Sequence, residues 1–273
     1  MDHFPILILI GRPASGKSEI IDYLVKADPG ERLRRYHVGT PDVLDDFEML
    51  WAWFEEDHIL ERSLGKPRLH TDSDGYFLDE SLWHLLIERL SLEYRKRQRD
   101  PLYHQTHTTI VEFSRGSEHG GYAKAFEHLS DETLAQAAIL YVRVSFSESL
   151  RKNRRRFNPE LPDSILEHSL PDAKLERLYK EDDWKELTGE GQTEDGLILD
   201  KLMRDGRMGD KLKACPTVGG GETAGGGVLM IRGQRVPYAV FENEDDVTSG
   251  EAAGLPGRLE ETLAELWKIR TVR

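Results

Sequence analysis

The stretch ILILIGRPASGKSEII, residues 6–21, decides which fold this chain adopts. Its apolar start, residues 6–10, predicts a short buried strand, and the residues from Lys17 onward predict a helix. Between them, Gly11, Gly16, Lys17 and Ser18 match the pattern GxxxxGK[ST] at every fixed position. A glycine-rich turn between strand and helix surrounds an anion with backbone N–H groups and the positive helix end. The predicted phosphate-binding loop therefore consists of Gly11, Arg12, Pro13, Ala14, Ser15, Gly16, Lys17, Ser18 and Glu19.

Two side chains of this loop carry specific chemical expectations. Lys17 would bring a positive charge to the terminal phosphates, and Ser18 would offer an oxygen to Mg²⁺. Motors, molecular switches and kinases share such loops. The chain has no Asn-Lys-x-Asp string to read guanine and no strand of four apolar residues ending in Asp-Glu. Both absences favour a phosphate that is transferred over one that drives motion or timing.

Composition limits the partners of the chain. Among its 273 residues, 50 acidic and 37 basic side chains give a net charge of -13, which argues against non-specific binding to a nucleic acid backbone. The single cysteine, Cys215, allows no intramolecular disulfide and favours a reducing compartment. The longest apolar run is far too short to span a membrane. These features predict a cytoplasmic protein without a membrane partner.

The pattern of apolar residues predicts an α/β protein. Strand-like runs alternate with helical ones, as in a parallel sheet with crossover helices. Periodic apolar positions predict helices over residues 43–54, 82–94 and 259–267, and buried strands are predicted over residues 5–10, 35–38, 108–113, 139–144 and 237–241.

A charged region interrupts this alternation. Residues 157–227 carry several prolines and end in the connector GGGETAGGG, residues 219–227. The sequence after it, VLMIRGQRVPYAVF, predicts a hairpin that turns at Gly233 and Gln234. We therefore expect a core formed by residues 1–156 and 228–273, with residues 157–227 as a mostly helical insertion.

A carboxylate stands near the end of the strand predicted over residues 108–113. Ligands of open α/β sheets bind at that edge, so Glu112 is a candidate to hold Mg²⁺ or to accept a proton. Arg115 could direct its guanidinium at a phosphate or carboxylate of the substrate. The alternative is a structural ion pair between these two residues.

The stretch SFSESLRKNRRR, residues 145–156, predicts a helix with arginines on one face. Ser145 and Glu148 have the spacing of a capping box. Arg151, Arg154 and Arg155 then share one helix face, whereas Lys152 and Arg156 share another. Like charges gathered on one face favour a bound anion, and a solvated basic face is the alternative.

The order of these motifs resembles the P-loop kinases of nucleosides and nucleoside monophosphates. The resemblance implies a three-layer P-loop NTPase core: a parallel five-stranded sheet of order 2-3-1-4-5 with helices on both faces and a mobile lid. It also implies that MgATP binds through Lys17 and Ser18. Arg151, Arg154 and Arg155 would be lid arginines and Arg115 would meet the acceptor. In YAVFENEDD, residues 238–246, Asn243 would lie near adenine.

Residues for the acceptor are less clearly indicated. The spacing of Glu112 and Arg115 matches neither branch of these kinases. Asp42, Asp45 and Asp46, at the end of the second predicted strand, are candidates for a catalytic aspartate. Asp72 and Asp74 lie in LHTDSDGYFL, residues 69–78, which could cover the acceptor, although an Asp-Gly turn is the alternative.

Together these patterns predict an ATP- and Mg²⁺-dependent kinase that acts on a small acceptor, such as a nucleoside, a nucleotide or a related metabolite. The alternative is a nucleotide-binding regulatory or ATPase module that has no phosphoryl acceptor. A polynucleotide 5′-kinase is disfavoured by the net charge of -13.

Overall fold

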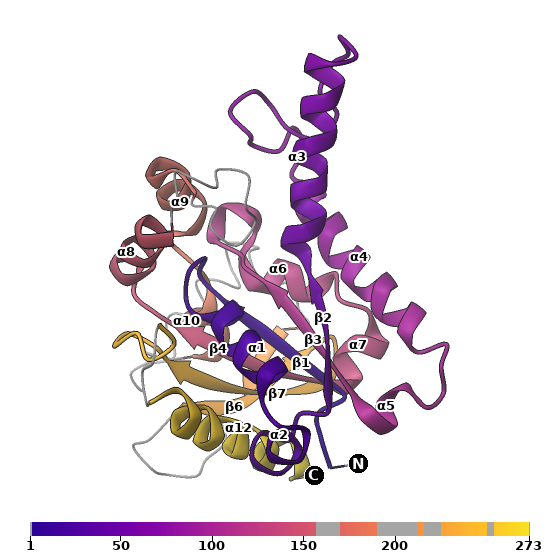
Figure 1. The fold of residues 1–273 in the computed structure, drawn as a ribbon, viewed down its shortest axis with the longest axis vertical. Coiled ribbons are helices and arrows are strands. Elements are labelled where there is room, and N and C mark those ends of the chain that lie inside the picture. Colours follow the sequence, from indigo (N-terminus) through magenta and orange to yellow (C-terminus); the bar gives the residue numbers. More distant parts are fainter. Residues whose placement is uncertain (1, 157–169, 190–211, 216–224, 250–253, 273) are drawn as a thin grey trace.

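The protein is built around one mixed β-sheet covered by helices (Figure 1). The computed structural model describes residues 2–156, 170–189, 212–215, 225–249 and 254–272. Within these ranges the sheet has seven strands in the order β2-β3-β1-β4-β7-β6-β5. In chain order they are β1 Ile6–Gly11, β2 Thr40–Asp45, β3 His107–Phe113, β4 Ala137–Arg143, β5 Leu212–Cys215, β6 Gly226–Ile231 and β7 Gln234–Glu242.

The sheet has a parallel part and an antiparallel extension. Strands β2, β3, β1, β4 and β7 are parallel to one another. Strands β6 and β5 continue the sheet beyond β7 in antiparallel fashion. The α/β class is thus confirmed. Five parallel strands are present, in the order β2-β3-β1-β4-β7, but the prediction of a sheet made of five parallel strands alone is wrong, because β6 and β5 extend it. The free edge of β7 pairs with β6, which the predicted hairpin supplies.

Helices cover both faces because the strand β1 is buried on both. Ile6, Ile8 and Ile10 pack with residues of α4, α6 and α10, whereas Leu7 and Leu9 pack with α1, α2 and α12. The long helix α3 projects beyond the sheet beside α4 (Figure 1). The helices are α1 Lys17–Lys26, α2 Pro29–Tyr36, α3 Asp46–Arg62, α4 Ser81–Arg97, α5 Tyr103–Thr106, η1 Ser117–His119, α6 Gly121–Glu127, α7 Asp131–Gln136, α8 Phe146–Arg156, α9 Asp172–Tyr179, α10 Trp184–Thr188 and α12 Leu255–Thr271.

One predicted strand is wrong. Residues 35 and 36 end the helix α2, residues 37 and 38 follow it without regular structure, and the strand β2 begins only at Thr40. Asp28 Oδ1 accepts hydrogen bonds from the N–H groups of Gly30 and Glu31, with Pro29 at the first helical position. These start signals override the strand propensity of the short apolar run.

The other predicted elements are found with shifted ends. The helix predicted over residues 43–54 begins only at Asp46, because residues 43–45 complete β2. The hairpin turns at Arg232 and Gly233, one residue earlier than predicted, since Ile231 pairs with Gln234. Both turn residues have positive φ angles, 48° and 82°. No helix among the described residues is long and apolar enough to cross a membrane.

Part of the predicted insertion packs into the core. Trp184 in α10 is 1% exposed, and its ring stacks on Tyr141 of β4 with a centroid separation of 4.4 Å. Gly226 and Gly227, from the predicted connector, begin β6. Residues 157–169, 190–211 and 216–224 of the insertion lie outside the described residues. The boundaries of the insertion therefore stay a prediction.

We expect Trp184→Ala to lower the free energy of unfolding by about 3–5 kcal/mol, because it empties a closed part of the core. Urea denaturation followed by circular dichroism measures this loss. Trp51→Ala, on the partly exposed face of α3, is the control and should cost clearly less. Equal losses for the two variants would contradict the packing of α10 into the core.

Candidate functional site

The predicted phosphate-binding loop connects β1 to α1 at the carboxyl edge of the parallel strands. The loop passes so close to β4 that a Cβ at Gly11 would lie 2.5 Å from the carbonyl oxygen of Val142. Gly16 precedes α1 with a φ angle of 109°, which side chains other than glycine rarely allow. The glycines at both fixed positions of the motif are therefore required by the backbone.

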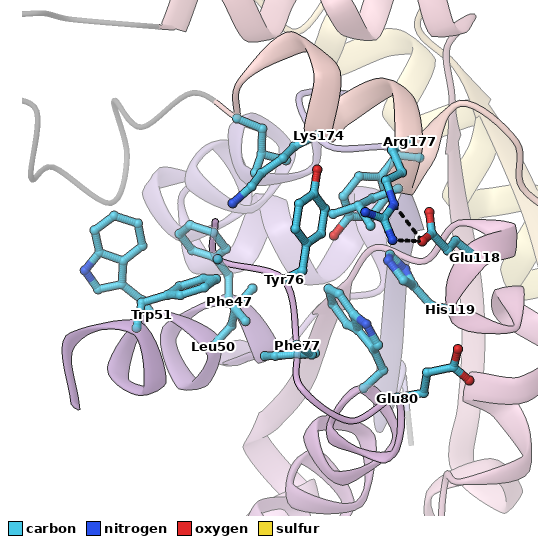
Figure 2. Close-up of a pocket in the computed structure, with 16 residues that line it drawn as sticks. Phe47, Leu50, Trp51, Tyr76, Phe77, Glu80, Glu118, His119, Lys174 and Arg177 are labelled. Atoms are coloured by element: carbon cyan, nitrogen blue, oxygen red, sulfur yellow. Dashed lines mark hydrogen bonds and ion pairs between the residues drawn. The ribbon is translucent and has the colours of Figure 1, made fainter. Parts of the chain in front are cut away.

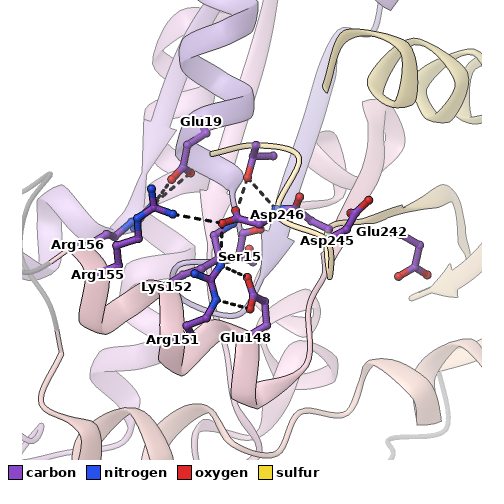
Figure 3. A network of polar contacts seen from close by, with 12 residues as sticks. Ser15, Glu19, Glu148, Arg151, Lys152, Arg155, Arg156, Glu242, Asp245 and Asp246 are labelled. Carbon is purple, nitrogen blue, oxygen red and sulfur yellow. Dashed lines mark hydrogen bonds and ion pairs between the residues drawn. The ribbon is translucent and has the colours of Figure 1, made fainter. Parts of the chain in front are cut away.

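Buried polar contacts hold the loop from behind. Asn243 Nδ2 donates to the carbonyl oxygen of Ser15 at 2.7 Å and to Thr248 Oγ1 at 2.8 Å. Lys152 Nζ pairs with Asp246 Oδ1 at 2.6 Å and donates to Thr248 Oγ1 (Figure 3). Asn243, expected near adenine, is fully buried and positions the loop instead.

Arg12 fixes a distant segment onto the loop. Its guanidinium donates to the carbonyl oxygens of Val144, Tyr179 and Lys180. It also pairs with Asp182 at 2.7 Å. The side chain of this loop residue is therefore committed to the segment between α9 and α10.

Lys17, Ser18 and Glu112 lie together, as the sequence predicted. Lys17 Nζ donates to the carbonyl oxygens of Gly11 and Arg12 and to Ser114 Oγ, and lies 3.8 Å from Glu112 Oε1. Ser18 Oγ donates to the same Oε1 at 3.5 Å. Burial lowers the pKa of Lys17, although the Glu112 carboxylate opposes this shift. A buried lysine beside one carboxylate is suited to receive further negative charge.

Asp45 and Asp46 bring two more carboxyl groups to this edge. Asp45, the last residue of β2, lies opposite Glu112 in the register of β2 and β3. Burial raises the pKa of Asp45 to about 8, and the neighbouring Glu112 and Asp46 add to this shift. Burial also raises the pKa values of Asp46 and Glu112. Such crowding favours a proton or a cation at this edge.

These residues border an open cavity of about 980 Å³, counting its mouth. Ser18, Asp45 and Glu112 lie on its wall, as do residues from α3 and α8, Leu170 just before α9 and Tyr179 at the end of α9. Within the described part of the chain, no group of three or more His, Cys, Asp or Glu side chains could hold a metal ion.

Arg115, predicted to meet the acceptor, has three protein partners already. It is 3% exposed, and its Nη1 atom lies 2.6 Å from Asp46 Oδ2. It also donates to the carbonyl oxygens of Ser114 and Trp83. Arg115 is thus a buried structural arginine, although its partner is Asp46 and not Glu112. Because Asp46 forms this ion pair, its carboxylate is not available as a catalytic base.

The arginines predicted to face phosphate are paired or turned to solvent. Arg151 pairs with Glu148 and Asp246, and Arg154 pairs with Asp172. Arg154 and Arg155 are 62% and 67% exposed at their side chains. Neither Arg151 nor Arg154 is among the residues that line the cavity at the loop. Arg155 lies 3.9 Å from Asp246 and borders a more open neighbouring cavity.

The opposite face of α8 contacts the loop. Ser149 Oγ donates to the carbonyl oxygen of Pro13 at 2.7 Å. Arg156, seven residues later, pairs with Glu19 at 2.9 Å and lines the cavity beside Glu112 (Figure 3). The polar residues of this face are spaced three and four apart: Ser149, Lys152, Asn153 and Arg156. Such spacing places side chains on one helix face, so the sequence could have predicted this stripe.

Asp42, Asp72 and Asp74 lie away from the loop. Asp42 is in register with Thr109, towards the amino end of β2, and accepts hydrogen bonds from Tyr103 and Arg97. Asp72 Oδ1 accepts from the N–H groups of Asp74 and Tyr76 and so closes a turn. The expected substrate role of these three aspartates thus has no geometric support, and the alternative of an Asp-Gly turn fits residues 72–76.

Comparisons with known proteins add little. No family model matches the chain, and no curated protein matches it. One solved structure, titled "Crystal structure of APE1195", aligns with 57% of this chain and 69% of its own at 15% sequence identity, with a TM-score of 0.31. A likeness at this level carries no functional argument.

We expect Gly16→Ala to weaken ATP binding at least tenfold, because the added Cβ would lie 2.5 Å from both Asn243 Nδ2 and Thr248 Oγ1. Isothermal titration calorimetry measures the affinity. Gly257→Ala is the matched control, since no atom lies within 4 Å of its new Cβ. It should leave binding unchanged and stabilise α12 slightly. Normal binding by Gly16→Ala would contradict the geometry of the loop.

Proposed function

We propose that this protein is an ATP- and Mg²⁺-dependent phosphotransferase that acts on a small hydroxyl-bearing acceptor. The observation that carries the proposal is the convergence of four side chains: Ser18, Glu112 and Asp45 line one cavity, and Lys17 Nζ lies 3.8 Å from Glu112 Oε1 behind that wall. A positive charge, a hydroxyl ligand and two carboxyl groups are the parts that phosphoryl transfer requires.

The loop offers polar atoms that fit a bound triphosphate. Ser15 Oγ is buried and has no hydrogen-bond partner within the described part of the chain. Buried polar atoms are rarely left unpaired, so a phosphate oxygen is a fitting partner. Ser18 and Glu112 would hold Mg²⁺, which neutralises negative charge on the phosphates. Lys17 would exchange its loop contacts for phosphate oxygens.

Asp45 is the best placed of the three candidate aspartates to act as the base. Asp46 is paired with Arg115, and Asp42 lies towards the other end of β2. In the proposed step, an acceptor oxygen forms a bond to the γ-phosphorus while the bond from that phosphorus to the β,γ-bridging oxygen breaks. Asp45 takes the hydroxyl proton, and ADP leaves with the bridging oxygen.

Arg156 takes the charge-stabilising role that the sequence suggested for Arg151, Arg154 and Arg155. Its guanidinium borders the cavity together with Ser18 and Glu112. Its pair with Glu19 is about 30% exposed on each side, so it can be exchanged for a phosphate oxygen at low cost. Arg156 would therefore stabilise charge on the transferring group.

We expect Lys17→Ala to reduce acceptor-dependent ADP formation at least about 100-fold while the protein stays folded. A coupled assay with Mg²⁺, ATP and a panel of nucleosides, nucleotides and phosphorylated metabolites measures turnover. Lys26→Ala, an exposed lysine of the same helix paired with Asp22, is the control and should leave turnover unchanged. Undiminished turnover by Lys17→Ala would overturn the proposal.

A nucleotide-binding module without an acceptor is the second candidate. It is favoured by Arg151 and Arg154, because their charges are neutralised by Glu148, Asp246 and Asp172 and not directed at a substrate. In that case ATP would bind normally, but no acceptor would raise ADP formation above the slow background hydrolysis.

The proposed base predicts a pH profile. Only the deprotonated carboxylate can accept a proton, so kcat/KM should rise with pH until the Asp45 pKa of about 8 is passed. Asp45→Asn should lower kcat at least about 100-fold and remove this rise. Asparagine can still accept the hydrogen bond from the Phe47 N–H group, which caps α3.

Asp28→Asn is the matched control, because Asp28 caps α2 in the same way but is exposed. Its pH profile should equal that of the wild-type protein. A rise that persists in Asp45→Asn would assign the base to another group.

A further inference from the structure

A second cavity opens beside the cavity at the loop (Figure 2). It lies between α3, the segment before α4, and α9, and measures about 850 Å³ with its mouth. The two cavities are adjacent, because they share five wall residues: Phe47, Leu50, Trp83, Leu170 and Tyr179. A molecule in the second cavity would therefore lie next to the cavity that Asp45 borders.

The wall of this second cavity is mainly aromatic. Phe77 and Trp83 meet with centroids 4.5 Å apart, and Trp83 stacks on His119 at 3.9 Å. Trp51 and Phe54, both from α3, also line this cavity. Aromatic walls of this kind favour planar rings, which gain stacking as well as burial.

Two cations from α9 stand at the same cavity. Lys174 Nζ lies 5.0 Å and Arg177 Cζ lies 4.3 Å from the ring centroid of Tyr76. Arg177 is neutralised by Glu118 at 2.7 Å. Among the described residues Lys174 makes no ion pair within 4 Å, although the carboxylates of Asp72 and Asp74 act on it from a longer distance. The Lys174 charge can therefore still pair with a negatively charged group on an occupant.

His119 supplies an unused hydrogen-bond donor. It is 5% exposed and lines the second cavity. Its Nδ1 atom accepts a hydrogen bond from the Gly116 N–H group, which assigns the ring proton to Nε2. Among the described residues, Nε2 has no partner. An acceptor atom on the edge of a bound ring would satisfy it.

We propose that the second cavity binds the phosphoryl acceptor, and that this acceptor is a planar aromatic molecule carrying a negatively charged group. The rings of α3 and of residues 76–83 stack on the planar part, Lys174 pairs with the charge, and His119 Nε2 donates to the ring edge. This inference rests on the proposed function for the identity of the occupant as acceptor. The aromatic and charged character of the cavity stands without it.

The inference is tested by measuring equilibrium binding of probe molecules in the absence of ATP, with quenching of tryptophan fluorescence as the signal. The probes form matched sets: adenosine monophosphate, cytidine monophosphate, pyridoxine 5′-phosphate and indole-3-acetate carry both ring and charge. Adenosine, cytidine, pyridoxine and indole-3-acetamide carry the ring alone, and ribose 5-phosphate, glycerol 3-phosphate and acetate carry the charge alone. At least one probe with both features should bind tenfold more tightly than each matched compound.

Variants locate the binding. Lys174→Met should weaken binding of the preferred probe about tenfold and leave its neutral counterpart unaffected, as expected for a charge-assisted contact. Lys180→Met is the matched control at the end of the same helix, where the lysine pairs with Glu176. Trp51→Leu should weaken binding of both ring-bearing members of a set.

The outcomes separate this inference from the proposed function. Equal affinity for charged molecules with and without a ring, an unchanged affinity in Lys174→Met, or no binding by any probe would each overturn the inference. Lys17→Ala should bind the preferred probe normally, since Lys17 does not line the second cavity. Normal probe binding without acceptor-dependent ADP formation would overturn the proposed function and leave the cavity assignment intact.

Discussion

The candidate site depends on one constraint: the backbone of residues 11–16 must curve from β1 into α1, which requires glycine at positions 11 and 16. Strand and helix alone do not maintain this curve. Asn243 holds the carbonyl oxygen of Ser15 from behind, and the Lys152–Asp246 pair holds the segment that carries Asn243 and Thr248. Because these groups are buried, losing one partner would leave another unpaired at a cost of about 1–3 kcal/mol. The support is therefore stiff.

The same support connects the loop to the second cavity. Arg12 binds carbonyl oxygens at the end of α9 and pairs with Asp182, so α9 is fixed relative to the loop. Trp184 then anchors the following helix in the core. Through these contacts the position of Lys174 at the second cavity is coupled to that of Lys17 and Ser18 at the loop.

Most basic side chains near the candidate site are paired with carboxylates, whereas several carboxyl groups lie close to one another. Most basic side chains of α8 are neutralised by nearby carboxylates, which suits a chain with a net charge of -13. The carboxyl groups Asp45 and Glu112 are crowded, and Asp46 is already paired with Arg115. A site with raised carboxyl pKa values gains stability when a cation or a proton arrives. This electrostatic imbalance marks the carboxyl ends of β2 and β3 as the place where ligand chemistry is favoured.

The sequence by itself determined the local features: the loop with its two required glycines, the strand before it, the helix after it and the hairpin near Gly233. Each is governed by residues adjacent in the chain, through backbone conformation and apolar period. Only the tertiary structure decided which groups meet. It added β6 and β5 to the free edge of β7, turned the 149–152–153–156 stripe of α8 towards the loop, and left Arg154 in solvent. It also paired Arg115 with Asp46, and it placed Asn243 where its side chain donates a hydrogen bond to the carbonyl oxygen of Ser15. Helical spacing fixes which residues share a face, but the element packed against that face comes from distant parts of the chain.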